Sequence, residues 1–460
     1  MYEIIVNISR YIFLIYICIF LLLGFFICLS EKSIICINNK IYLLMQRLII
    51  FFFHTSAFTI LSFNKETRNI DLSIVPFFIL TLIFIILGNI IACIFYKNSC
   101  HLLWNGIFFL MSIGITTLYR LNPYLAKRQF IWFILGFCIC LVTPIILNIL
   151  PRLNLFKYLY LFLGLSLLLA TLIIGIEDGG AKNWISIKNF TFQPSELVKI
   201  LFIFYLSSCF CSHHLRIRDL IFPSIMSFIF IVCLVFQTDL GSALIFFMTY
   251  LVILYISTSK IWLVYLGAIL ASIGSFLGYK LFNHVRVRVQ IWLNPWSDIS
   301  NKGYQIAQSL FAIGTYGAMG SGFNMGMSQT IPVVEKDLIF SAICEEFGVL
   351  FAIGLISIFI MIFYRSVRIS LNSQNKFLGL LSSGMTSLLC FQTFLIIGGA
   401  TKFIPLTGVT LPFVSYGGSS IIINFIIIGI LQWVSIRNVK YNLSNQEIDN
   451  IEVDNIEIEI

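Results

Sequence analysis

The sequence predicts an all-α, polytopic helical membrane protein. Hydrophobic residues make up 59% of the 460 positions, and charged residues only 11%. Apolar stretches of about 20 residues, the length that crosses a bilayer core as an α-helix, recur along nearly the whole chain. A soluble fold would need several of these stretches to be buried core helices, so we set it aside.

The candidate spans follow one another closely, at about residues 11–29, 41–63, 72–96, 101–119, 129–150, 156–176, 194–211, 219–237, 241–257, 261–282, 338–363, 377–400 and 415–435. The first lacks the basic start and the cleavage site of a signal peptide, so we expect it to be retained. The second contains Arg47 and His54. An arginine in lipid is unfavourable unless it snorkels or faces protein, so twelve spans are an alternative. Residues 438–460 are predicted to be an acidic cytoplasmic tail, disordered from Asn442 on.

Charge in the connecting loops predicts the orientation of the bundle. After residue 100, short and almost purely basic loops alternate with loops of mixed charge. Short basic loops carry the orientation signal and stay in the cytoplasm, whereas a long segment can translocate regardless of its charge. We therefore expect the mixed-charge loops to share the outer face of the membrane, at residues 120–128, 177–193, 238–240, 283–337 and 401–414.

Two kinds of binding are disfavoured by the composition. The net charge of +9 is modest for this length and no basic stripe with interleaved aromatic residues is present, so no nucleic acid partner is expected. Basic residues at helix ends instead favour contact with membrane lipids. Glycines are dense between Gly303 and Gly326, but the segment lacks the Gly-Lys-Ser/Thr of a nucleotide-binding P-loop.

The strongest candidate for chemistry is the charged segment at the start of the predicted span 338–363. Its ionisable residues are Glu335, Lys336, Asp337, Glu345 and Glu346. Asp337 stands at the first helical turn, where it either caps the helix or acts as a catalytic carboxylate. Glu345 and Glu346 lie about two turns deeper, so at least one should meet a partner or be protonated, and we expect supporting roles for both.

A second charged feature opens the predicted span 194–211. Glu196 and Lys199 are three residues apart and share one helix face at the membrane boundary, directly after Gln193 and Ser195. They form either a structural ion pair or the charged lining of a cavity. Further polar, charged or small residues of interest in the outward loops are Asp239, Arg286, Arg288, Gln305, Ser415, Gly417 and Gly418.

Five motifs, present in a fixed order, carry a family resemblance. They are Phe192-Gln-Pro-Ser-Glu196, Gln237-x-Asp-Leu-Gly241, Tyr304-Gln305, Asp337-x-Ile-Phe340 with Glu345-Glu346-x-Gly348, and Pro405-x-Thr-Gly-x-x-Leu-Pro-Phe-x-Ser-Tyr-Gly-Gly-Ser-Ser420. The ordered set, from about Ser112 to Arg437, resembles the SEDS family of bacterial rod-shape, division and sporulation proteins. Departures at Thr238, Lys336 and Ile396 leave the choice among elongation, division and sporulation open.

The resemblance implies a fold and a function. It implies a ten-helix core over residues 101–437, with the large extracellular loop 283–337, and leaves two or three extra N-terminal transmembrane helices in residues 1–100. It implies a peptidoglycan glycosyltransferase of the bacterial plasma membrane that polymerises lipid II, the lipid-linked disaccharide-pentapeptide, at the extracytoplasmic face. It also implies a class B penicillin-binding protein as the crosslinking partner. Asp337 matches the family's essential aspartate, and Glu196 with Lys199 match its conserved charged pair.

The chemistry of the residues agrees with that reaction. Glycosyl transfer from a lipid pyrophosphate needs a base near the acceptor hydroxyl, here Asp337, and positive charge near the departing pyrophosphate. No cofactor is certain, although a divalent cation, Mg²⁺ or Mn²⁺, could share the second task. Glu196 and Asp239 would line the same cavity. The candidate pyrophosphate ligands on the outer face are Arg128, Lys199, Arg286, Arg288 and Lys402.

Two alternatives from other classes stay open. A transporter that flips lipid II would also use a lined cavity with membrane-embedded carboxylates. Against it, the charges concentrate in one leaflet instead of lying at the midplane between internal repeats. A non-enzymatic scaffold of the cell-wall synthesis machinery is the second alternative, but a scaffold has no need for the charged constellation.

Overall fold

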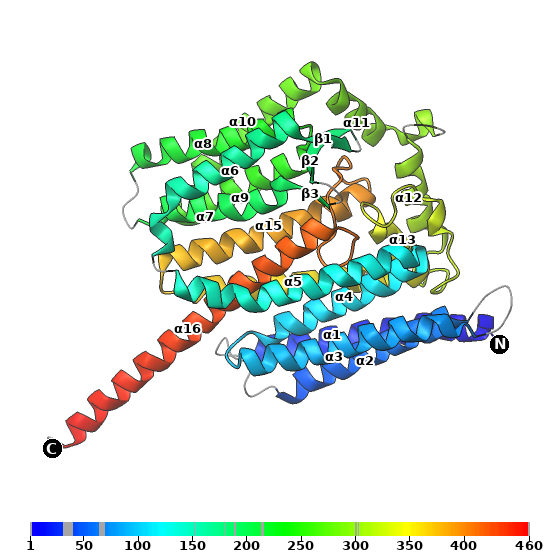
Figure 1. Cartoon of the computed structure of the whole chain (residues 1–460), viewed down its shortest axis with the longest axis horizontal. Helices are drawn as coiled ribbons and strands as arrows, with labels where there is room; N and C mark the ends of the chain where they lie inside the picture. Colours follow the sequence, from blue (N-terminus) through cyan, green and yellow to red (C-terminus); the bar gives the residue numbers. More distant parts are fainter. Residues whose placement is uncertain are drawn as a thin grey trace.

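The computed structural model is a bundle of helices with one small sheet (Figure 1). It describes residues 2–30, 40–63, 70–150, 152–178, 180–187, 190–212, 216–299, 301 and 303–458. The antiparallel sheet has the strand order β1-β2-β3, with β1 (Ile176–Asp178), β2 (Ala181–Ile187) and β3 (Phe190–Phe192). The α-helices are α1 (Tyr2–Ser30), α2 (Lys40–Ser62), α3 (Val75–Phe95), α4 (His101–Leu121), α5 (Pro123–Ile149), α6 (Lys157–Ile174), α7 (Pro194–Phe210), α8 (Ile217–Phe236), α9 (Leu240–Thr258), α10 (Ile261–Leu281), α11 (Asn283–Leu293), α12 (Tyr304–Thr315), α13 (Ile339–Phe347), α14 (Val349–Leu371), α15 (Lys376–Ala400) and α16 (Gly418–Ile458). Between some of these helices, the described residues form four 3-10 helices: η1 (Leu72–Ile74), η2 (Leu153–Leu155), η3 (Pro295–Asp298) and η4 (Ser328–Thr330).

Twelve helices in the described residues are long and apolar enough to cross a membrane. The remaining predicted span, 194–211, corresponds to α7, which has 17 residues. The prediction of a polytopic helical membrane protein is therefore confirmed. α1, α2 and α3 are the extra N-terminal helices, so their number is three.

α2 belongs to the bundle because its polar side chains find partners in neighbouring helices. Arg47 donates hydrogen bonds to Asn105 Oδ1 at 3.3 Å and to Cys93 Sγ at 2.9 Å. The His54 ring is hydrogen-bonded to the hydroxyls of Ser112, at 2.9 Å, and Thr81, at 2.8 Å. Polar groups that bond across helices do not face lipid alone, so the alternative of twelve spans without 41–63 was wrong.

The predicted span 338–363 was wrong in one respect, because the chain breaks there into α13 and α14. Gly348 separates the two helices with a φ of 93°, a conformation that favours glycine. A Cβ at Gly348 would lie 2.4 Å from the carbonyl oxygen of Ala318. The break lets the segment around Ala318 pack directly on the backbone between α13 and α14.

The end of the chain also differs from the prediction. We expected residues 442–460 to be disordered, but α16 continues as a helix to Ile458 and projects from the bundle (Figure 1). The stretch contains no glycine or proline that would end a helix. The prediction of disorder for residues 442–458 was therefore wrong.

The connections that we expect to share one face lie at the same end of the bundle, on the right in Figure 1. Backbone and side-chain hydrogen bonds join them there. The backbone N–H of Lys182 donates to the carbonyl oxygen of Gln237, and that of Tyr416 to the carbonyl oxygen of Glu335. The indole of Trp292 donates to the carbonyl oxygen of Lys402. We call this the loop end of the molecule.

The break at Gly348 gives a test of the fold. Gly348→Ala should lower the free energy of unfolding by on the order of 1 to 3 kcal/mol, because a Cβ is strained at this φ and collides with the Ala318 carbonyl. Gly274→Ala on α10 is the matched control, since no atom lies within 4 Å of its added Cβ and its φ is not in the positive range. Thermal unfolding in detergent should separate the two variants. Equal melting temperatures would contradict the assigned conformation.

Candidate functional site

Asp337 lies at the loop end, between η4 and α13. Its backbone N–H donates to the carbonyl oxygen of Val333 at 3.2 Å, and Val333 has a positive φ of 55° that turns the chain. The N-cap of α13 is Leu338, without a side-chain hydrogen bond to the helix. Within the described part of the chain, the partly buried Asp337 carboxylate has neither a hydrogen bond nor an ion pair. The geometry therefore does not support the capping alternative.

The surroundings of Asp337 shift its acidity toward neutral pH. Burial raises the pKa of Asp337 from 3.8 to about 6, and the positive charges of Lys336 and Arg288 limit the rise. Arg288, a candidate pyrophosphate ligand, comes from α11 and lies near enough for its charge to act on the carboxylate. A carboxylate with this pKa can take up and release a proton near neutral pH.

Two other segments contact the Asp337 loop. The position of a Cβ on Gly408 would be 3.8 Å from Asp337 Oδ2, which puts loop 401–417 beside the carboxylate. The same loop is fixed by the bond of 2.8 Å from the Tyr416 N–H to the Glu335 carbonyl. From α12, Gln305 donates to the carbonyl oxygen of Pro332 at 3.4 Å. Gln305 thus supports the turn that precedes Asp337.

The candidate pyrophosphate ligands are only partly gathered here. Arg128 is exposed on α5 and lies near Tyr416, where its charge opposes the rise that burial causes in the pKa of Tyr416. Lys402 belongs to loop 401–417, and its carbonyl oxygen accepts from the Trp292 indole at 3.1 Å. Arg286 instead turns to the end of α10, where it donates to the carbonyl oxygen of Lys280 at 3.0 Å.

Glu345 and Glu346 are buried and hold loop 318–328 against α13. The Glu345 carboxylate accepts from the N–H of Met327 at 2.7 Å and from the Ser328 hydroxyl. The Glu346 carboxylate accepts from the N–H of Asn324 at 3.1 Å and lies 3.2 Å from Arg120 Nε. The expectation that these carboxylates meet partners is confirmed, and their bonds give them structural roles.

Arg120 was missed by the sequence analysis. It pairs with Glu346 and donates to the carbonyl oxygen of Gly326 at 2.9 Å, so it joins α4 to the same loop. Its only signal in the sequence is a positive charge at the end of an apolar span.

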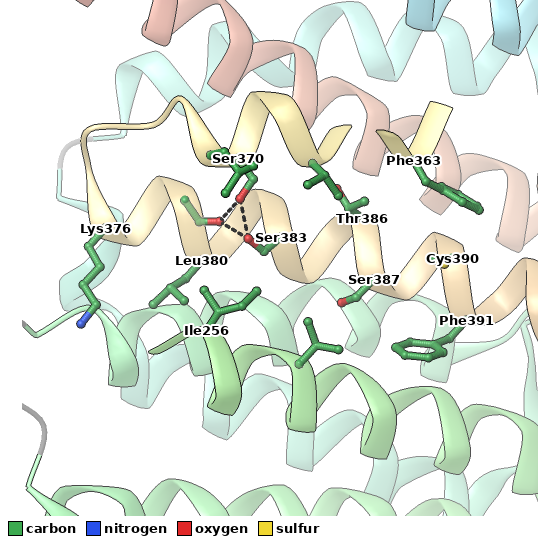
Figure 2. A pocket seen from close by; sticks show the side chains of 14 residues that line it. Ile256, Phe363, Ser370, Lys376, Leu380, Ser383, Thr386, Ser387, Cys390 and Phe391 are labelled. Atoms are coloured by element: carbon green, nitrogen blue, oxygen red, sulfur yellow. Dashed lines mark hydrogen bonds between the residues drawn. The ribbon is translucent and has the colours of Figure 1, made fainter. Parts of the chain in front are cut away.

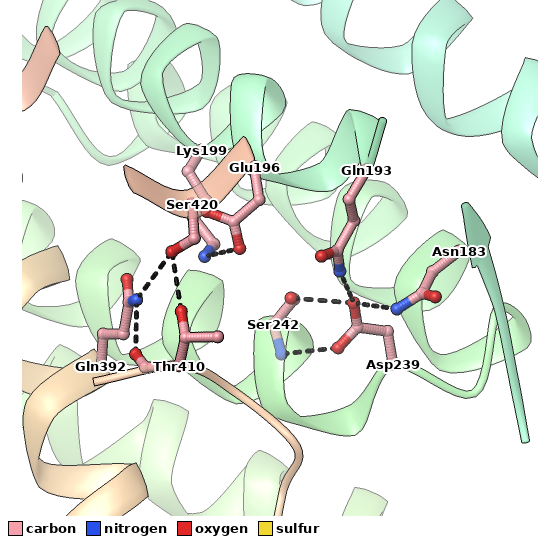
Figure 3. A network of polar contacts seen from close by, with 9 residues as sticks. All are labelled: Asn183, Gln193, Glu196, Lys199, Asp239, Ser242, Gln392, Thr410 and Ser420. Carbon is pink, nitrogen blue, oxygen red and sulfur yellow. Dashed lines mark hydrogen bonds and ion pairs between the residues drawn. The ribbon is translucent and has the colours of Figure 1, made fainter. Parts of the chain in front are cut away.

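Glu196 and Lys199 form a buried ion pair on α7, with Lys199 Nζ 2.7 Å from Glu196 Oε1. Figure 3 places the pair beside a group of polar side chains from α15 and α16 and from loop 401–417. In that group Gln392 donates to the Thr410 carbonyl at 2.9 Å, and the Thr410 hydroxyl donates to Ser420 at 2.8 Å. The ion-pair interpretation is thus observed, in a polar interior region.

Asp239 has a structural role at the start of α9. Its Oδ2 accepts from Asn183 at 3.0 Å, from Gln193 at 3.2 Å and from the Ser242 hydroxyl at 2.9 Å, while its Oδ1 accepts from the Ser242 N–H at 3.0 Å (Figure 3). These bonds cap α9 and tie it to β2 and to the start of α7. Asp239 and Gln193 are therefore occupied in fixing the sheet, and Asn183 was not singled out from the sequence.

Ser415, Gly417 and Gly418 lie where loop 401–417 and the start of α16 contact α5. Ser415 accepts a hydrogen bond of 3.0 Å from the Leu411 N–H, and its carbonyl oxygen accepts from Gln129 at 2.9 Å. Gly417 donates to Gln129 Oε1 at 3.2 Å, and a Cβ on Gly418 would collide with the Trp132 ring at 2.6 Å. The small residues at the start of α16 therefore permit close contact with α5.

The interior around the ion pair contains polar atoms without a hydrogen-bond partner. Among the described residues, these atoms are Ser195 Oγ, Glu196 Oε2 and Gln392 Oε1. Buried polar atoms are rarely left without partners, so this region has the character of a site that takes up water or a polar ligand. It lies beneath loop 401–417, which also borders Asp337.

A cavity of about 490 Å³ lies elsewhere, between α9, α14 and α15 (Figure 2). Its lining is almost entirely apolar, apart from hydroxyls such as Ser370 and Ser383 and the lysine Lys376. Lys376 begins α15, whereas Asp337 lies near the opposite end of that helix. The cavity therefore lies away from Asp337, and its mostly apolar lining is not suited to a sugar or a pyrophosphate.

The described residues contain no group of three His, Cys, Asp or Glu side chains that could hold a metal ion. Of the carboxylates discussed above, Glu345, Glu346 and Asp239 are each engaged by several donors and Glu196 is paired with Lys199, which leaves Asp337 as the one without a partner among the described residues. These residues do not fit a Mg²⁺ or Mn²⁺ ion held by protein ligands alone. We therefore derive no step through a cation.

Comparison with known proteins places the chain among cell-wall synthesis proteins. The family model for the FtsW, RodA and SpoVE group, described as "Cell cycle protein", matches residues 95–440. "Peptidoglycan glycosyltransferase RodA" of Mycobacterium tuberculosis is 33% identical over 329 residues, covering 67% of this chain and 70% of the relative. "Probable peptidoglycan glycosyltransferase FtsW" of Wigglesworthia glossinidia brevipalpis is 33% identical over 342 residues, covering 71% and 88%.

Solved structures agree with these relatives. A chain from the structure titled "Structural coordination of polymerization and crosslinking by a peptidoglycan synthase complex" aligns with a TM-score of 0.62 at 26% identity, covering 73% of this chain and 97% of that chain. The rod shape determining protein RodA of Thermus thermophilus aligns with a TM-score of 0.52 at 24% identity, covering 72% and 95%. The second likeness supports the fold.

The buried ion pair on α7 gives a test of the site's construction. Lys199→Met should lower the free energy of unfolding by roughly 3 to 5 kcal/mol, because it leaves the Glu196 carboxylate buried without its cation. The double variant Glu196→Gln with Lys199→Met should recover much of that loss, since no charge then remains unpaired. Thermal unfolding of all four proteins forms a double-mutant cycle. Single effects that simply add would show that the two side chains do not interact.

Proposed function

This chain belongs to the FtsW/RodA/SpoVE family of cell cycle proteins, and we propose that Asp337 is the general base of its reaction. The chain is a peptidoglycan glycosyltransferase, as its curated relatives are. That activity favours catalysis over the transporter and scaffold alternatives. The observation that carries the proposal is the Asp337 carboxylate, which has a pKa of about 6 and no partner among the described residues.

The reaction assigned to Asp337 is a displacement at a sugar carbon. An acceptor hydroxyl of one saccharide attacks the anomeric carbon of a second, and the bond from that carbon to a lipid pyrophosphate oxygen breaks. The hydroxyl proton passes to an oxygen of Asp337, and the lipid pyrophosphate departs. General-base assistance of this kind typically contributes about 10²- to 10⁴-fold to the rate. The proposed substrate is lipid II.

The departing pyrophosphate requires positive charge on the same face. Arg288 lies near Asp337, and Lys402 and Arg128 lie on or near loop 401–417. Arginine side chains bind phosphate oxygens in a bidentate manner, and their charge offsets the negative charge that develops on the leaving group. We assign these three residues to the pyrophosphate. Lys199 is held by Glu196 and is assigned to the polar interior beneath the loop.

The chain is a multi-pass membrane protein, and we place Asp337 on the extracytoplasmic face of the bacterial plasma membrane. The support is that the mixed-charge loops gather at the loop end with Asp337, while the short basic loops lie at the other end. The similar chain from a complex that coordinates polymerization and crosslinking supports a class B penicillin-binding protein as partner.

Asp337→Asn should lower the rate of polymerisation by about 10²-fold or more, because an amide cannot take up the proton of the acceptor hydroxyl. The measurement is the amount of glycan polymer formed from lipid II by the purified full-length chain with its partner. Asp298→Asn in the same loop is the matched control and should retain activity, since Asp298 accepts a hydrogen bond from Asn301 in an exposed turn. A folded Asp337→Asn variant that polymerises at the parental rate would remove the assignment.

The pH dependence follows from the same carboxylate. Activity should fall as the pH drops through about 6, where Asp337 becomes protonated. Because folding raises this pKa, the stabilising contribution of Asp337 is complete below about pH 4 and is lost as the pH rises through about 6. Asp337→Asn should therefore melt at a higher temperature than the parent at pH 8. Its free energy of unfolding should be larger by on the order of 1 to 3 kcal/mol at pH 8, and this difference should disappear near pH 4. A lower melting temperature at pH 8 would contradict the assigned pKa.

A further inference from the structure

We propose that Arg10, on the first N-terminal helix, is a positioning residue that holds the loop carrying Asp337 in its active conformation. The proposal rests on the proposed function, because it concerns the same site. α1 lies before residue 95, where the family match begins, so the family pattern assigns it no role. Its first residues nevertheless lie at the loop end of the molecule (Figure 1).

Arg10 contacts the loop backbone directly. Its Nη2 donates to the carbonyl oxygen of Ser321 at 2.6 Å. The next residue, Gly322, lies so close to α1 that a Cβ there would be 2.4 Å from Val6 Cγ1 and 3.1 Å from Arg10 Nε. Only glycine fits this contact, which also has a φ of 97°.

The same two loop residues are fixed on their other side by α13. The N–H groups of Ser321 and Gly322 donate to the carbonyl oxygens of Glu345, at 2.7 Å, and Glu346, at 3.0 Å. These carbonyls belong to the last turn of α13, where a helix leaves its carbonyl groups without intrahelical partners. Residues 321 and 322 are therefore held between α1 on one side and α13 on the other.

Residues 321 and 322 are connected to Asp337 through both ends of α13. Glu345, whose carbonyl accepts from Ser321, uses its carboxylate to hold Met327 and Ser328, and the chain continues from there to Asp337. Asp337 is followed by Leu338, the N-cap of α13. A displacement of residues 321–322 would thus change both the position of α13 and the path of the loop that leads to the carboxylate.

α1 is itself firmly attached. The Phe13 ring packs against Phe323 and Phe347, with ring centroids 5.9 and 5.2 Å apart. Further along α1, the carbonyl oxygen of Phe20 accepts from Gln46 on α2 at 3.1 Å. Arg10 is half-buried, and its Nε has no hydrogen-bond partner among the described residues, so the bond from Nη2 to Ser321 is what links it to the loop. A charge-assisted bond from a fixed helix can restrict the loop more than a bond from a mobile side chain.

The test compares variants of the full-length chain in polymerisation of lipid II. Arg10→Gln should lower kcat by about 10-fold or more and change KM by less than about 2-fold, because a misplaced base slows the chemical step, whereas the proposed pyrophosphate ligands stay in place. Arg10→Lys should recover most of kcat, since an ammonium can also donate to the Ser321 carbonyl.

Arg47→Gln is the matched control. Arg47 also joins the N-terminal helices to their neighbours, through Asn105 and Cys93, but these bonds are distant from the loop. We expect Arg47→Gln to lower the melting temperature and leave kcat near the parental value. If Arg10→Gln and Arg47→Gln lose kcat in the same proportion as stability, Arg10 has a merely structural role and the proposal is overturned.

A second measurement does not depend on activity. Amide hydrogen exchange followed by mass spectrometry should show faster exchange over residues 318–328 in Arg10→Gln, with unchanged exchange in α15. Unchanged exchange over 318–328 would overturn the proposal even if kcat fell. If the parent chain with its partner forms no glycan polymer, the proposed function fails, and the exchange experiment still decides whether Arg10 holds the loop.

Discussion

The conformation of the loop end depends on the hydrogen bonds that two buried glutamates receive. Glu345 and Glu346 lie in an apolar chain, where a charge without a partner is strongly unfavourable. Their carboxylates are satisfied mainly by backbone N–H groups of loop 318–328, together with Ser328 and Arg120. Because all of these donors except Arg120 sit on the loop itself, the loop must fold back onto α13. This requirement fixes Met327 and Ser328 beside α13, and the chain continues from there to Asp337.

Asp337 contrasts with the two glutamates in the same segment. All three are carboxylates within the sequence from Asp337 to Glu346, but only Asp337 has its oxygens left without donors among the described residues. Its raised pKa means that the ionised form is held at a cost in stability. The surrounding loop can hold an unfavourable charge because α13, α12 and loop 401–417 fix its backbone independently. A stable framework and a strained reactive group are thus built from neighbouring residues.

The sequence predicted those features of the structure that depend on neighbouring residues in the chain. Apolar stretches predicted the helices, the motif order singled out Asp337 as a candidate, and the three-residue spacing of Glu196 and Lys199 predicted their ion pair. The break at Gly348 was not predictable from hydropathy, because apolar residues continue on both sides of it. The partners of Asp239 were also hidden, since Asn183 is 56 residues away and no spacing rule links the two. Arg120 and Arg10 act on carbonyls and carboxylates more than 200 residues away in the chain, so only the folded structure shows what they bind.

The number of N-terminal helices determines at which end of the bundle α1 begins. Each transmembrane helix takes the chain from one end of the bundle to the other, and α4 runs toward the loop end. With two preceding helices, the first would begin at the end opposite Asp337. With three, the beginning of α1 lies at the loop end, within hydrogen-bonding distance of Ser321. Arg47, on the second helix, is correspondingly near the other end, with Cys93. The addition of three helices therefore brings an arginine from outside the family core to the loop that carries the proposed base.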